Sequence, residues 1–392
     1  MNPHCLYLDY NATSPLAASV TAWLSSGDLL YANPASQHMA GKASRKAINE
    51  SRRFLYSLFN LSELEFELFF HSGATESIAS FTYSFSEWAR REKKKLLICT
   101  ANTDHSATSS LKERFWGDHV EFFDLKLLPD LSYDHESNLE ALKRYKSDNP
   151  ESFILYHHLW VHNETGLVSP LNDLKPFKSI EGLFLHIDSV QAPGKILDWR
   201  NLVVGDMFSF SSHKFGSLKG MGFSFFSKKI KYFPLLTGGG QQKDLRSGTE
   251  NVLGVQSIKL ALEDLLKVDI EQTYRLRDEL KGFLKLELKD LGGVLEVYPA
   301  NSNTIYFYLN HLTSDISLAL FDLHGLMISA GSACSSGTAR PSSVLREAHL
   351  NAVARNGLRM SLNFATQEEE IVKIKNQLAQ VFKKIRLTLP RY

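Results

Sequence analysis

Short apolar runs alternate with helix-like stretches through the first two-thirds of the chain, and this alternation constrains the fold more strongly than any other feature. The strand-like runs are Leu96–Thr100, Phe153–Leu159, Leu183–Asp188, Met207–Ser211 and Gly222–Ser227. The helix-like stretches are Ser44–Leu58, Glu76–Arg90 and Asn138–Lys146. Helices and loops of this length between strands are typical of parallel crossover connections. We therefore predict an α/β fold whose large domain has a mostly parallel sheet between helices.

Beyond about residue 265 the pattern changes. A long amphipathic stretch, Val268–Leu291, ends at a pair of glycines, where helices commonly stop. The strand-like run Asn303–Leu309 follows, and a closing helix is predicted to begin at the capping box of Thr366 and Glu369. These elements predict a smaller C-terminal α+β domain. We place the large domain at residues 15–264 and the small domain at residues 1–14 and 265–392.

Charge and cysteine content exclude several classes of protein. The 392 residues include 44 basic and 43 acidic side chains, so no excess of positive charge favours a nucleic-acid partner. No apolar run reaches the ~18 residues of a membrane-spanning helix, and the N-terminus lacks a secretion-signal pattern. Three scattered cysteines are too few for a disulfide framework or a zinc cluster. We expect a cytoplasmic protein with no bound metal.

One lysine directly follows a predicted strand. Lys214 comes after Ser211, Ser212 and His213, at the end of an apolar run. A lysine that forms an imine must lose its proton, which requires a position shielded from water and flanked by polar groups. Taken alone, such a sequence is more often that of an ordinary polar loop. Asp188 strengthens the signal because it ends the preceding strand-like run, and a carboxylate can keep the ring nitrogen of pyridoxal phosphate protonated.

Further segments are suited to a phosphorylated ring compound. His71–Glu76 passes from a strand-like run into a helix, where backbone N–H groups and small hydroxyl residues can bind phosphate or simply cap the helix. His105 follows another strand and can stack on a pyridine ring, although a histidine there can also be a plain loop residue. Gly238–Gln241 and Arg246–Thr249 form a second glycine-rich stretch, which can approach an anion or serve as a hinge.

Nine segments, taken in order, resemble the cysteine desulfurase family of fold-type I pyridoxal-phosphate enzymes, in the class V aminotransferase group. They are Tyr7–Ser14, Asn33–Gly41, Ser72–Glu76, Asn163–Gly166, His186–Gln191, Ser211–Lys214, Gly238–Asn251, Gly331–Ser336 and Arg359–Ser361. Each segment alone is a weak signal, but together they cover nearly the whole chain. The resemblance implies the fold-type I pyridoxal-phosphate fold, pyridoxal 5'-phosphate as the cofactor, and a homodimer.

The resemblance also implies a role for each matching residue. Lys214 would hold the cofactor as a Schiff base and then move the α-proton of the substrate. Asp188 would pair with the ring nitrogen, Gln191 would bond to the ring oxygen, and His105 would stack on the ring as a catalytic and cofactor-binding residue. The residues implied at the cofactor phosphate are Ala74, Thr75, Ser211 and His213, with Thr249 contributed by the partner subunit. The residues implied at the substrate carboxylate are Asn163 and Arg359.

Cys334 decides which reaction the resemblance implies. A free cysteine is ordinarily a small buried apolar residue, but Gly331–Gly337 consists of small and polar residues that keep a thiol accessible. In the family, this cysteine takes sulfur from L-cysteine, so that L-alanine leaves and a persulfide remains on the enzyme. The sulfur would then pass to an acceptor protein, either an iron–sulfur scaffold or a thiolation relay. Cys5 and Cys99 are expected to be structural.

Several positions depart from the family pattern, and two other functions stay open. The departures are Ile78, Asp104, His162, Gln242, Asp244 and Asn363. None of them removes a residue with an implied catalytic role. The first alternative is a selenocysteine lyase or another class V pyridoxal-phosphate enzyme. The second is a non-catalytic binding protein that keeps the fold, which a colourless purified protein would indicate.

Overall fold

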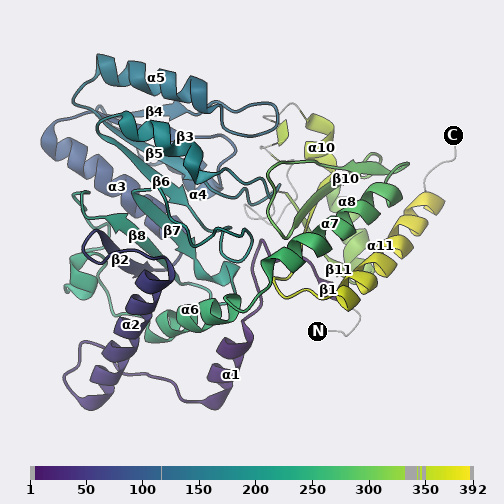
Figure 1. The fold of residues 1–392 in the computed structure, drawn as a ribbon, viewed down its shortest axis with the longest axis horizontal. Helices are drawn as coiled ribbons and strands as arrows, with labels where there is room; N and C mark the ends of the chain where they lie inside the picture. Colours follow the sequence, from purple (N-terminus) through teal and green to yellow (C-terminus); the bar gives the residue numbers. More distant parts are fainter. Residues whose placement is uncertain (1–4, 116, 332–341, 343–344, 347–349, 389–392) are drawn as a thin grey trace.

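A computed structural model describes residues 5–115, 117–331, 342, 345–346 and 350–388, with the side chains of residues 351 and 352 left out. A seven-stranded sheet forms the centre of the larger half of the molecule (Figure 1). Its strands, in spatial order, are β2 (Phe66–His71), β8 (Gly222–Ser227), β7 (Met207–Ser211), β6 (Leu183–Asp188), β5 (Phe153–Leu159), β3 (Leu96–Thr100) and β4 (Val120–Asp124). Neighbouring strands are parallel, except that β8 runs antiparallel to β2 and β7. The predicted mostly parallel α/β sheet is confirmed.

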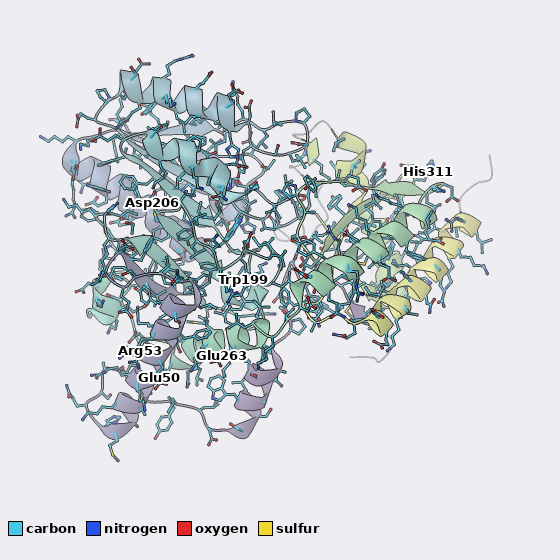
Figure 2. The ribbon with its side chains drawn as sticks, in the orientation of Figure 1. Glu50, Arg53, Trp199, Asp206, Glu263 and His311 are labelled. Carbon is cyan, nitrogen blue, oxygen red and sulfur yellow. The ribbon has the colours of Figure 1, made fainter. Side chains whose placement is uncertain are left out.

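Helices pack on both faces of this sheet. The longer ones are α1 (Ala18–Ser26), α2 (Met39–Leu58), α3 (Ala74–Glu92), α5 (His135–Asp148) and α6 (Val252–Leu265). Because side chains of a strand alternate between the two faces, Leu68 and Phe69 of β2 enter different cores. Phe69 packs with Phe81 of α3 on one face, and Leu68 joins a core with residues of α2, α5 and α6 on the other. Trp199, labelled in Figure 2, belongs to this second core, where its ring packs edge-on against Phe59 with the centroids 5.8 Å apart.

The rest of the chain builds a second, smaller apolar core around another sheet. This antiparallel sheet has the order β12 (Ser329–Ala330), β13 (Gly357–Ser361), β10 (Thr304–Leu309) and β9 (Gly292–Val294). The helices here are α7 (Ile270–Glu287), α8 (Ser314–Leu323), α10 (Asn351–Asn356) and α11 (Glu368–Thr388). Leucines of α7 and apolar residues of α11 pack with β10 and β13 in a core of their own. Figure 1 shows this unit beside the seven-stranded sheet.

The N-terminal segment lies against the C-terminal unit. Strand β1 (Leu6–Tyr7) pairs in parallel with β11 (Leu326–Met327), and Asp9 forms a bridge with Ser361 of β13. The chain then passes to the seven-stranded sheet, where Ser14 N–H donates to the carbonyl of His213 over 2.9 Å. Residues 9–14 therefore connect the two cores. The domain limits at residues 14 and 264 stay a prediction.

Most predicted elements are present, but some boundaries and one cap are wrong. The helix expected at Val268–Leu291 is α7, which is shorter at both ends because Asp269 caps it and the chain leaves the helix at Leu288. Helix α11 begins at Glu368, so Thr366 is not its cap; the Thr366 hydroxyl instead donates to the carbonyl of Asn363. The predicted set lacked strand β4 and helices α1, α6 and α8.

The described parts of the chain contain no helix that is long and apolar enough to cross a membrane. The same residues form no group of three or more histidine, cysteine or acidic side chains that could hold a metal ion.

Candidate active site

A cavity of about 580 Å³ opens at the carboxyl ends of the parallel strands, beside the start of α3. This is the edge where sheets of this type bind ligands, because the loops that follow the strands converge there. The cavity brings together ten of the predicted site residues: Ala74, Thr75, His105, Asn163, Asp188, Gln191, Ser211, His213, Lys214 and Arg359. Asn11, Ala12 and Thr13 of the connecting segment also line it.

The N-terminus of α3 forms one end of the cavity. Ala74 and Thr75 are the first two residues of this helix, whose opening N–H groups have no partner within the helix. Ser211 ends β7 next to this turn, with its Oγ 3.6 Å from the position that a Cβ on Gly73 would take. The N–H groups, the helix dipole and the Ser211 hydroxyl make this end suitable for an anion such as phosphate.

The glycine-rich stretch that precedes α6 is held against the same helix turn. Arg246 Nε donates to Glu76 Oε1 over 2.9 Å, and Ser72 N–H donates to Glu76 Oε2 over 2.8 Å. Thr249 lies a few residues beyond this contact, and it is exposed and does not line the cavity of its own chain. Its implied contribution to the site of a partner subunit stays a prediction.

Lys214 reaches the centre of the cavity from the short turn that follows β7. Its Nζ donates to the carbonyl oxygens of Asn11 and Ala12, over 2.9 and 2.8 Å. The neighbouring His213 forms a hydrogen bond through Nδ1 with the hydroxyl of Thr13, at 3.1 Å. Burial, and to a smaller extent the charge of Lys214, lowers the pKa of His213 to about 4. The connecting segment thus holds the two functional groups of the predicted motif.

Two residues that the sequence assigns to a cofactor ring line the same cavity. Asp188 is the last residue of β6, it is 6% exposed, and its Oδ1 accepts the N–H of Val190 over 3.1 Å. Burial raises the pKa of Asp188 to about 6, although Val190 and the charge of Lys214 act in the opposite direction. Burial, assisted by Lys214, lowers the pKa of His105 to about 4, and its Nδ1 accepts the N–H of Ala107. His105 is therefore a neutral imidazole with its proton on Nε2.

Arg359 enters from β13 of the smaller unit and is 1% exposed. Its Nη1 donates to the carbonyl of Asn163 over 2.9 Å, and its Nη2 pairs with Asp9 Oδ1 over 2.7 Å. Its Nε has no hydrogen-bond partner among the described residues. Contacts with Asp9 and Asn163 aim the guanidinium, which can bind a carboxylate.

Cys334 lies outside the described residues. The described residues on either side of its segment meet at one buried carboxyl group. Ser342 Oγ donates to Glu164 Oε2 over 2.7 Å, and a Cβ on Gly331 would come within 2.4 Å of the same oxygen. Burial raises the pKa of Glu164, which favours the protonated acid. The structure therefore brings Gly331 and Ser342 together at Glu164, the residue that follows Asn163 in the chain.

Sequence reasoning assigned no role to Asn11 or Lys195, which support the cavity. The Asn11 side chain contacts Thr304 Oγ1 over 2.8 Å and Lys195 Nζ over 3.0 Å. Lys195 is completely buried, and burial lowers its pKa well below the usual range. The segment Tyr7–Ser14, which resembles the family, contains Asn11 and could have indicated it. No local sequence pattern distinguishes a buried lysine such as Lys195 from an exposed one.

Among the departures from the family pattern, His162 and Gln242 bond to the backbone of neighbouring segments. His162 Nε2 lies 3.1 Å from the carbonyl of Thr103, which precedes His105 by two residues. The Gln242 amide bonds to both the N–H and the carbonyl of Phe70 in β2, at 2.7 and 2.8 Å. These two side chains hold backbone segments beside the cavity, and neither departure removes a residue that lines it.

The arrangement as a whole suits a flat, anionic ring compound. An amine and a buried carboxyl group face the cavity from adjacent strands β7 and β6, His105 offers a neutral ring, and the helix N-terminus offers N–H donors. The donor set therefore fits a phosphorylated pyridine with an aldehyde that a lysine can attack.

Comparison with known proteins agrees with this geometry. The family model described as aminotransferase class-V matches residues 6–374. A cysteine desulfurase of Cereibacter sphaeroides is 31% identical and covers 98% of this chain and 97% of its own. Cysteine desulfurase IscS of Methanosarcina thermophila is 30% identical over 98% of this chain and 94% of its own. A solved NifS-like protein, 25% identical, superposes with a TM-score of 0.81 over 98% of this chain and all of its own. The chain belongs to the class-V aminotransferase family and, within it, to the cysteine desulfurases.

Proposed function

We propose that the protein is a pyridoxal-phosphate-dependent cysteine desulfurase that converts L-cysteine to L-alanine and carries the sulfur as a persulfide on Cys334. The observation that carries this proposal is the convergence of three side chains in one cavity: Asp188 from the end of β6, Lys214 from the turn after β7 and Arg359 from within β13. Family membership accounts for the reaction, and the cavity accounts for where this chain can perform it.

The residues that would hold the cofactor are those with an implied cofactor role that line the cavity. Ala74, Thr75, Ser211 and His213 would bind the phosphate at the end formed by α3, and Lys214 would hold the cofactor covalently. Asp188 and His105 would contact the ring. When bound, pyridoxal phosphate withdraws electrons from the α-carbon of the substrate.

Three groups of the chain then act on the substrate. Arg359 would bind the substrate carboxylate with the side chain of Asn163, since its guanidinium is already aimed by Asp9. Lys214 Nζ would take and return the α-proton, with the carbonyls of Asn11 and Ala12 stabilising its protonated form. Neutral His105 would contribute as a hydrogen-bond donor through its Nε2–H group.

The sulfur step uses Cys334. Its thiolate would attack the sulfur of the substrate, so that a sulfur–sulfur bond forms while the carbon–sulfur bond breaks and its electron pair stays on carbon. Protonation of that carbon gives L-alanine, and the sulfur remains on the enzyme as a persulfide. A thiol-bearing acceptor protein, an iron–sulfur scaffold or a thiolation relay, would then remove it.

We also propose a homodimer, a cytoplasmic location, and a division into a domain of residues 15–264 and a domain of residues 1–14 and 265–392. The exposed position of Thr249 supports the homodimer, because the residue is free to enter the site of a partner. The free thiols of Cys5 and Cys99 support a reducing compartment. The separate apolar cores support the division.

The cofactor proposal has a direct test. Purified protein is expected to be yellow, and borohydride reduction should fix the cofactor on the tryptic peptide that contains Lys214. Lys214→Ala should abolish the labelling and the release of alanine from L-cysteine. Label on Lys219, an exposed lysine at the cavity edge, would contradict the assignment.

A further inference from the structure

Lys195 is a buried lysine with an unusual set of partners. Its side chain is 0% exposed and makes no ion pair with any acidic residue in the described part of the chain. Its Nζ donates instead to two neutral amides, Asn11 Oδ1 over 3.0 Å and Gln191 Oε1. Because an isolated buried amine is costly, a lysine kept in this position needs an explanation beyond packing.

A tight turn brings this amine back onto Gln191. The N–H of Ala192 donates to the carbonyl of Ser189 over 3.1 Å, and the N–H of Lys195 donates to the carbonyl of Ala192 over 3.0 Å. Gly194 adopts a φ of +72°, and a Cβ there would come within 2.5 Å of a methyl group of Leu265. The turn therefore requires glycine at position 194 and brings the Lys195 side chain against Gln191.

The contact with Lys195 decides which way the Gln191 amide points. An amide has an oxygen that accepts and an NH₂ group that donates, and a lysine amine in this contact donates. Gln191 Oε1 therefore faces Lys195, and Gln191 Nε2 donates to the carbonyl of Asn11 over 3.0 Å while it lines the cavity. The reverse orientation would place an NH₂ group against an amine that donates to two oxygens, and the amide oxygen against the carbonyl oxygen of Asn11.

The same amine also orders the segment that holds the cavity lysine. Asn11 Oδ1 accepts from Lys195, and the carbonyl oxygen of Asn11 accepts from Lys214 Nζ over 2.9 Å. The carbonyl of Lys195 accepts the N–H of Ser302 over 2.8 Å, which links the turn to the smaller unit. The Lys195 side chain thus contacts Gln191 directly and also contacts Asn11, whose carbonyl oxygen holds Lys214.

We propose that Lys195 is a positioning residue, which fixes the Gln191 amide with its NH₂ group toward Asn11 in the cavity wall, where it would donate to the ring oxygen of the cofactor. The role rests on the proposed function, because it concerns a ring oxygen that Gln191 would contact. It differs from a purely structural role in acting through one identified side chain.

A double-mutant cycle on cofactor affinity tests this role. Lys195→Met has nearly the same volume and no donor. In apoprotein titrated with pyridoxal phosphate, Lys195→Met should raise the Kd about tenfold, the effect of one misdirected hydrogen bond. Gln191→Ala should raise the Kd by a similar factor, and adding Lys195→Met to it should change the Kd by less than about twofold. Lys46→Met, on an exposed surface, should change nothing.

Two further measurements separate positioning from general damage. The pH midpoint of the visible absorption of the bound cofactor should shift in the same direction in Lys195→Met and Gln191→Ala, which a loss of packing would not produce. Lys195→Gln retains a side-chain donor and should restore most of the affinity. It also serves as the test variant if Lys195→Met fails to fold: a tenfold loss of affinity in a folded Lys195→Gln protein would overturn the role.

The remaining outcomes are distinct from one another. Equal losses from Lys195→Met in the wild-type and Gln191→Ala backgrounds would overturn a role through Gln191. An unchanged Kd in Lys195→Met would overturn the role altogether while leaving the proposed function intact. Failure of the wild-type apoprotein to bind pyridoxal phosphate would overturn both.

Discussion

Replacing Asp188 by asparagine should stabilise the cofactor-free protein and weaken cofactor binding. Asp188 is 6% exposed at the end of β6, and burial raises its pKa to about 6 from an ordinary value of 3.8. The folded protein therefore binds a proton at Asp188 more tightly than the unfolded chain does. Stability falls as the pH rises from 3.8 to about 6 and stays lower above that range. Asparagine has no charge to desolvate and can still accept the Val190 N–H.

The magnitude follows from the difference between these two pKa values. At about 1.4 kcal/mol for each pKa unit, full ionisation of Asp188 costs the folded apoprotein about 3 kcal/mol at pH 8. The same relation gives about 1 kcal/mol at pH 4.5, because Asp188 is then mostly protonated in the fold. The stabilisation by Asp188→Asn should therefore grow by about 2 kcal/mol between these two pH values.

Urea denaturation of the apoproteins at pH 4.5 and pH 8 measures the effect, and Asp28→Asn, an exposed site, serves as the control. The Kd of Asp188→Asn for pyridoxal phosphate should rise, since asparagine cannot pair with a protonated ring nitrogen. Stability and affinity thus move in opposite directions. If Asp188→Asn is less stable than wild type at pH 8, or gains equally at both pH values, the reasoning about the buried charge is wrong.

The other predictions concern the sulfur step, the substrate and the partner subunit. Cys334→Ser should keep the colour of the protein and its spectral change on adding L-cysteine, yet release essentially no alanine; release near the wild-type rate would instead favour the selenocysteine lyase alternative. Arg359→Lys keeps the charge but cannot contact both Asp9 and Asn163, so the KM for L-cysteine should rise about tenfold or more in steady-state assays, with a smaller change in kcat. Light scattering should show a dimer, and Thr249→Ala should weaken cofactor binding several-fold; a fully active monomer would contradict the shared site.

Local chemistry in the sequence predicted much of the cavity. Asp188, Ser211 and Lys214 follow apolar strands directly, and parallel strands place their carboxyl ends at one edge of a sheet. A residue that directly follows such a strand is therefore expected at the edge of the sheet where the cavity lies. The α3 turn was predictable for the same reason, because small residues between a strand and a helix mark an exposed helix N-terminus.

Contacts between distant segments could not be predicted. Arg359 pairs with Asp9 across 350 residues of sequence, and Asn11 bonds with Thr304 across 293. No local pattern encodes such pairs, since each arises from how the two cores pack together. The capping box at Thr366 failed for a local reason: helix α11 begins only at Glu368, and the Thr366 hydroxyl donates to the carbonyl of Asn363 three residues earlier.

The sequence by itself determined the α/β sheet, most of its strands and the residues that follow them, because side-chain periodicity and strand ends are local properties. Only the tertiary structure decided the burial of Lys195 and the engagement of Arg359 with Asp9. It alone showed that Glu164 lies between the described residues on both sides of the Cys334 segment. The physical reason is desolvation: whether a charged side chain is solvated or buried depends on which distant segments cover it, and burial in turn sets its partners and its pKa.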